Sequence, residues 1–177
     1  MTFGASSAIF QQAILNPLAR GISAISAFPT SYAGLGNDDV RVALFNDTTT
    51  PSKSAAVGST GYNTGVWVTG NEVIDTLNTN WVAGGRTTAS KALSVDSGSS
   101  SLCFQAASVA GAGNVTITNA FGCLVYDFTI SAGTVAKQGM CYNSFGGSAQ
   151  GVTNGTFTIL WATVGALTNV VIFNITV

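Results

Sequence analysis

Val40-Arg41-Val42-Ala43-Leu44-Phe45 stops at the pair Asn46-Asp47, and this stretch decides the fold class. Six residues dominated by β-branched and large apolar side chains favour a strand, and an Asn-Asp pair is a turn signal. Further along, residues 114–119 alternate apolar and polar side chains with the period of two expected of a half-buried strand. Both stretches predict β structure.

Other candidate strands share this composition and are separated by glycine-rich turns. They comprise residues 121–130, 136–143, 156–162 and 171–177, with weaker candidates at 87–95 and 101–107. Short strands at this spacing predict an all-β protein, an antiparallel β-sandwich with a jelly-roll-like arrangement. Residues 71–77 give the one hint of a helix in this part of the chain, and a loop fits them equally well.

Residues 1–37 differ from the rest and are expected to form an N-terminal arm and linker, followed by a β-sandwich domain at 38–177. Ser6 or Ser7 would cap a short helix, which Pro17 would end or kink. The helix would either pack on its own domain or dock on a neighbouring subunit. A terminal apolar element on a Gly/Ser/Pro linker reaches a neighbour at little cost, which favours docking. The expected partner-interface residues recur at helical spacing: Ile9, Phe10, Ile14, Leu18, Ile22 and Ile25.

Charged and catalytic side chains are scarce. The 177 residues contain no histidine, and 7% are charged, against roughly 25% in an average soluble domain. Six Lys+Arg against seven Asp+Glu give a net charge of −1. The sequence therefore lacks the excess of positive charge that binding of nucleic acid requires. Low net charge, together with a mean hydropathy of +0.40, favours association. We therefore expect a homo-oligomer that covers much of its apolar surface.

Membrane, secretory and redox signals are weak. No run reaches the roughly 18 apolar residues of a membrane helix, and the first residues lack the basic start of a secretory signal. Cys103, Cys123 and Cys141 each lie in an apolar context. Buried free thiols are the prediction, and one disulfide with a spare thiol remains the alternative.

Catalytic and metal patterns are also weak. A nucleophilic Ser or Cys has no histidine base, and no local signature supplies another. Glu72 and Asp75 would share a helix face if residues 71–77 were helical, but we expect a solvated pair rather than an acid/base couple. Asp38-Asp39 and Asn46-Asp47 offer oxygen ligands without the density of a calcium loop. The expectation is a protein that is not an enzyme, with no cofactor and no metal site.

Two tryptophans in a Gly/Asn/Thr-rich stretch, Trp67 and Trp81, are the candidates for contact with a ligand such as a saccharide. The alternative is that they pack a long loop onto the sandwich. Trp161 shares a predicted strand face with Phe157 and Ile159 and is expected in the core.

Several ordered segments together resemble tailed-bacteriophage virion proteins that decorate or cement capsids. The segments are Val40–Asp47, Gly61–Trp67 leading to Asn71–Val73, Trp81–Arg86, Phe121–Asp127 and Gly155–Trp161. The likeness spans residues 40–177 and leaves the N-terminal arm outside. It implies a β-sandwich made in the host cytoplasm that sits on the virion surface, often as a trimer. There it would hold neighbouring major capsid proteins together, and the family has no catalytic residues to carry over.

A phage tail or fibre component is the alternative, with a receptor-binding role if Trp67 and Trp81 were exposed to saccharide. A carbohydrate-binding domain of a secreted enzyme is a third class, opposed by the absence of a signal sequence.

Overall fold

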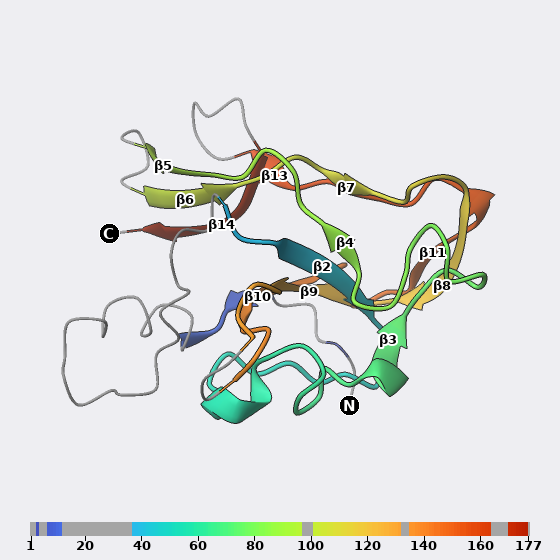
Figure 1. Cartoon of the computed structure of the whole chain (residues 1–177), viewed down its shortest axis with the longest axis horizontal. Helices are drawn as coiled ribbons and strands as arrows, with labels where there is room; N and C mark the ends of the chain where they lie inside the picture. Colours follow the sequence, from blue (N-terminus) through green and yellow to red (C-terminus); the bar gives the residue numbers. More distant parts are fainter. Residues whose placement is uncertain are drawn as a thin grey trace.

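The computed structural model describes residues 3, 7–11, 37–96, 101–131, 135–163 and 170–176, and its strands dominate the view in Figure 1. All the strand pairs in these residues are antiparallel. Two short 3-10 helices lie between strands, η1 (Val57–Ser59) and η2 (Thr69–Asn71). The predicted all-β class is confirmed, and the jelly-roll arrangement stays a prediction.

The first sheet is built around β2 (Val40–Phe45), which has the bounds predicted from the sequence. β2 lies antiparallel to β9, with Val40 opposite Asp127 and Phe45 opposite Gly122. The strand order is β1 (Ala8–Ile9), β10 (Gly139–Ser144), β9 (Gly122–Asp127), β2 and β3 (Glu72–Val73), and β4 (Arg86–Thr87) also pairs with β2.

A second sheet and two short ladders complete the described fold. The second sheet has the order β13 (Ala162–Thr163), β14 (Val170–Thr176), β6 (Ser101–Gln105) and β5 (Ala92–Asp96). The ladders pair β11 (Gln150–Gly155) with β8 (Val115–Ala120) and β12 (Thr158–Ile159) with β7 (Val109–Ala110). β11 was not predicted, because its sequence QGVTNG carries one large apolar residue and a turn-like Asn-Gly pair.

The first sheet is buried on both faces. Along β2, Val40, Val42 and Leu44 join the larger core cluster, whereas Ala43 and Phe45 join a second one. β9 divides in the same way, because successive side chains of a strand point to opposite faces. Burial on both faces explains why the stretch that decides the fold is nearly all apolar instead of alternating.

Aromatic rings dominate the second core cluster. Trp67 lies at its centre, with ring centroids 5.0 Å from Phe45, 5.9 Å from Phe10 and 6.1 Å from Phe3. All three contacts are edge-to-face, the arrangement that aromatic quadrupoles prefer. The outer face of the first sheet is therefore covered by the N-terminal segment together with the loop that carries Trp67.

The N-terminal segment is a strand at Ala8–Ile9, where a helix was predicted, whereas Gln11 is helical and residues 12–36 lie outside the described residues. Ala8–Ile9 form a strand on the edge of β10, and the amide of Phe10 donates to the carbonyl of Met140 at 3.0 Å. Phe10 is 0% exposed within its own chain, which corrects the expectation that it contacts a neighbour. Strand pairing and ring burial outweigh the weak helix preference of a short segment.

The rest of the predicted interface is less settled. Ile9 is half-buried and packs against the larger core cluster. Ile14, Leu18, Ile22 and Ile25 lie outside the described residues, so their role at an interface stays a prediction, as does the domain boundary at residues 37 and 38.

The Phe10→Ala substitution tests the role of the N-terminal segment in the fold. Removing a fully buried ring should lower the free energy of unfolding by about 3–5 kcal/mol, measured by urea denaturation. Leu160→Ala is the matched control, because Leu160 is 76% exposed and its loss should cost less than about 0.5 kcal/mol. A Phe10→Ala variant as stable as the control would show that the segment is not part of the core.

Candidate functional site

Trp67 and Trp81 are core residues and not ligand contacts. Both side chains are 0% exposed. Trp67 fills the second core cluster, and the ring of Trp81 packs edge-to-face on Phe157 at 5.7 Å in the larger one. The alternative prediction, a long loop packed onto the sandwich, holds for both. Trp161 is buried as expected, and its Nε1 donates to the carbonyl of Ala107 at 3.1 Å.

Glu72 and Asp75 hold loops in place and do not form a solvated pair. Residues 72–77 contain β3 and turns but no helix. Glu72 accepts from the Tyr62 hydroxyl at 2.7 Å and from the amide of Gly84 at 2.8 Å. Asp75 is 2% exposed, and its Oδ1 accepts from the amide of Thr116 at 2.9 Å. Each carboxylate is occupied by structural hydrogen bonds, which leaves no acid/base couple here.

Two stacked tyrosines complete the polar network around Glu72. The Tyr62 and Tyr126 rings lie 4.8 Å apart, and the Tyr126 hydroxyl donates to the carbonyl of Gly84 at 2.7 Å. Burial raises the pKa of both hydroxyls and of Glu72. The tyrosines therefore stay protonated donors, and the network positions the turn at Gly84-Gly85. Gly85 has φ +72° and lies where a Cβ would be 2.0 Å from the Val42 carbonyl oxygen.

Cys103, Cys123 and Cys141 are all buried, which confirms the prediction of buried thiols. Burial raises the pKa of Cys123 to about 12 and also raises that of Cys141. The thiolate is the reactive form of cysteine, so these thiols are packing groups and not nucleophiles.

The Asp38-Asp39 pair has two separate structural roles. Asp39 Oδ2 accepts from Arg41 Nε at 2.9 Å and from Nη2 at 2.7 Å, and its Oδ1 accepts from Thr87 at 2.9 Å. Asp38 faces Asp127, and both carboxyls are buried with an Oδ2 that has no hydrogen-bond donor. Within the described residues, no group of three or more Cys, Asp or Glu side chains is placed to hold a metal ion.

The buried carboxyl pair makes stability depend on pH. Burial, followed by the charge of Asp38, raises the pKa of Asp127 to about 6. Protonation of Asp127 relieves the cost of burying its charge and its repulsion by the nearby Asp38.

Exposed apolar side chains gather on the second sheet. Leu93 and Val95 in β5 are 65% and 67% exposed, and Leu102 in β6 is 47% exposed. Val95 lies opposite Leu102 in the β5–β6 ladder, so these side chains share one face. The sequence signal for this face is the alternation in residues 91–96 and 101–105. That alternation predicts the strands, but it does not predict that Leu93, Val95 and Leu102 are exposed.

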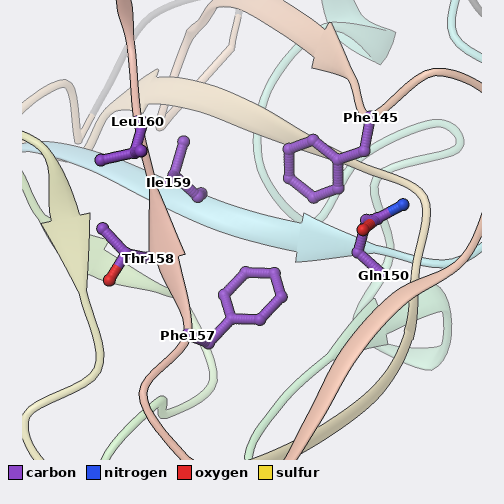
Figure 2. A pocket seen from close by; sticks show the side chains of 6 residues that line it. All are labelled: Phe145, Gln150, Phe157, Thr158, Ile159 and Leu160. Atoms are coloured by element: carbon purple, nitrogen blue, oxygen red, sulfur yellow. The ribbon is translucent and has the colours of Figure 1, made fainter.

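A second apolar surface surrounds an open pocket of about 340 Å³. Phe145, Gln150, Phe157, Thr158, Ile159 and Leu160 line it. Figure 2 shows the rings of Phe145 and Phe157 turned toward the same space, with Gln150 beside them. These residues come from β12 and from the segments around β11, so this surface does not belong to the β5–β6 sheet.

No protein-family model, curated protein or solved structure matches the chain. In the part of the chain that the structure describes, no helix is long and apolar enough to cross a membrane. The candidate site is therefore defined by two surfaces of the described residues: the apolar face of β5 and β6, and the pocket lined by Phe145 and Phe157 together with their neighbours.

The Asp127→Asn substitution tests the buried pair. The folded protein holds a proton on Asp127 between about pH 4 and pH 6 that the unfolded chain has lost, so the free energy of unfolding falls as pH rises through that window. We expect a loss of up to about 3 kcal/mol in the unsubstituted protein. The side-chain amide of Asn at this position can still accept from the amide of Thr129, and its NH₂ group adds a donor for Asp38. The variant should therefore be more stable than the unsubstituted protein at pH 7.5. Its free energy of unfolding should no longer fall between pH 4 and pH 6.

Asp47→Asn is the control, because Asp47 is a half-exposed turn residue whose substitution should leave the slope unchanged. Urea denaturation between pH 4 and pH 8 measures all three proteins. An Asp127→Asn variant that keeps the full pH slope would show that Asp127 does not cause it.

Proposed function

We propose that this chain is a non-enzymatic structural protein of a tailed-phage virion that binds the outside of the capsid and cements neighbouring major capsid proteins. The resemblance of residues 40–177 to capsid decoration proteins supports the proposal. The observation that carries it is a pair of separate apolar surfaces on a chain with only six Lys+Arg and seven Asp+Glu. A protein that joins two neighbours needs at least two contact surfaces.

The mechanism is burial of apolar surface between neighbours, which yields about 25 cal/mol for each Å² removed from water. A protein that binds only the assembled, expanded shell stabilises that state by mass action. The polar groups found in the described residues support this role indirectly. Glu72, Asp75 and Tyr62 are engaged in internal hydrogen bonds, which leaves the apolar surfaces as the features that distinguish the exterior.

The described residues on either side of the connection formed by residues 12–36 belong to the folded part of the chain. Gln11 donates to the Lys53 carbonyl at 3.1 Å, and Asn37 immediately precedes the Asp38 site. Residues 12–36 are 25 residues long, and a chain of that length held at both ends reaches out by at most about 40 Å. In the proposal, Ile14, Leu18, Ile22 and Ile25 on this connection contact a neighbour.

Binding to capsids depleted of this chain tests the role of the connection. A variant with Ile14→Ser, Leu18→Ser, Ile22→Ser and Ile25→Ser should cosediment with the particles at least tenfold more weakly, because the apolar contact is lost. The matched control exchanges the same four residues among Ile and Leu and should bind normally. Both variants keep Phe3 and Phe10, so the second core cluster remains intact. Equal binding of both variants would remove the connection from the proposal.

Cryo-EM of the native particle tests the function itself, with the chain located and counted. The expected result is density at many symmetry-related sites on the head. Density confined to the tail or to a fibre would overturn the cement role.

The open pocket favours a second candidate, a tail or fibre module that binds a receptor saccharide. Two aromatic rings beside the exposed amide of Gln150 combine a stacking surface with a polar group that can orient a sugar. In this case, NMR titration with host surface saccharides should shift resonances around Phe157, and Gln150→Ala should weaken the binding. Ser148→Ala, an exposed neighbour outside the pocket lining, is the control. Saturating saccharide without any shift would remove this candidate.

A further inference from the structure

We propose that β5 pairs with β5 of a second copy of this chain across a two-fold axis, so that two β5–β6–β14 sheets become one continuous sheet. The proposal concerns contact between copies and does not depend on the capsid role. It rests on the free edge of β5, on the exposed side chains along it, and on the way its sequence complements itself.

The edge of β5 is longer than the other ends of the two main sheets. Among the described residues, these sheets otherwise end in strands of two residues each: β1, β3 with β4, and β13. β5 has five residues, and in the part of the chain that the structure describes it pairs with β6 on one side only. Figure 1 shows it at the outer edge of its sheet. Short end strands are a common protection against edge-to-edge pairing, and β5 lacks that protection.

Other protective features are absent from β5 as well. The strand has no proline, and residues 92–95 carry no charge. Its ladder with β6 runs from Ala92 opposite Gln105 to Asp96 opposite Ser101 without a bulge. Leu93 and Val95 point outward, at 65% and 67% exposed. A regular edge whose central residues carry no charge and expose apolar side chains is a template for another strand.

The sequence of β5 indicates that the other strand is a second β5. In an antiparallel pair centred on Ser94, Leu93 lies opposite Val95 of the partner copy, and Val95 lies opposite its Leu93. Directly opposite side chains share a face, so these four residues form one apolar cluster. Leu102 of each copy extends the cluster outward, because it lies opposite Val95 in the existing ladder.

The lysine that precedes the strand also favours the antiparallel arrangement. Lys91 immediately precedes β5. In an antiparallel pair centred on Ser94, the Lys91 residues of the two copies lie at opposite ends of the new ladder. A parallel pair in register would place them side by side, where like charges repel each other. An isologous contact of this kind closes on itself and yields a defined pair of copies.

Sedimentation velocity over a range of concentrations tests the contact. We expect the unsubstituted chain to form dimers, or larger oligomers joined in pairs, and Leu93→Lys with Val95→Lys to weaken this association at least tenfold. Both side chains are exposed, so folding should be retained, and urea denaturation checks this. Leu160→Lys places a new charge at a residue 76% exposed on the other apolar surface and should leave the association unchanged.

Mixed cysteine variants test the register. Chains with Leu93→Cys mixed with chains with Val95→Cys should form disulfide-linked dimers under oxidised glutathione, more readily than either variant alone, because the two positions lie directly opposite. The native cysteines are buried and will not compete. A mixture of Leu93→Cys with Leu160→Cys is the control and should remain unlinked.

Three results would overturn the proposal: a monomer at all concentrations, an oligomer that the two lysines do not affect, and dimers without the mixed disulfide. A trimer unaffected by the lysines would remove the β5 contact and leave the capsid role standing. Conversely, β5 dimers that fail to bind capsids would remove the capsid role and keep the contact.

Discussion

Burial of the β10–β9–β2 sheet on both faces is the constraint on which the rest of the structure depends. A sheet of this kind needs two covers, and the chain supplies them from distant parts of its sequence. The outer cover uses Phe3 and Phe10. Gly122 and Gly139 in the strands beneath leave room for these rings, because a Cβ would lie 2.2 Å from the ring of Phe3 at Gly122 and 2.8 Å from that of Phe10 at Gly139. Glycine within a strand often marks such a close approach.

Local sequence patterns predict the strands better than they predict which faces are covered. β2 has its predicted bounds, because its apolar run and its turn signal lie within a few residues. The spacing of Ile9 and Phe10 suits a helix as well as an edge strand, and β10, which decides between them, lies some 130 residues further along the chain. The alternation in β5 identifies two faces, but the exposure of Leu93 depends on what lies opposite it in space.

Local sequence patterns also fail to predict the hydrogen-bond partners of the polar residues in the candidate site. The spacing of Glu72 and Asp75 suggested a shared helix face, whereas the structure directs Glu72 to Tyr62 and Gly84, and Asp75 to Thr116. A carboxylate that serves a distant backbone amide leaves no local signature. Trp67 and Trp81 were open to either interpretation for a related reason, because a Gly/Asn/Thr-rich loop can equally well hold a tryptophan outward or fold it beneath.

Most of the carboxylates that the structure describes have roles within the fold, and this affects how much negative charge is left on the surface. Asp39 holds Arg41, Asp38 and Asp127 face each other in the interior, and Glu72 and Asp75 are tied to loops. In a chain with only seven Asp+Glu, these roles leave few carboxylates to repel another copy. Exposed charge is what normally keeps apolar patches and strand edges apart in solution. By using most of its carboxylates to organise turns and strand ends, the fold leaves few of them to shield Leu93, Val95 and Leu102, so the proposed contact between copies would be a consequence of how the interior is built.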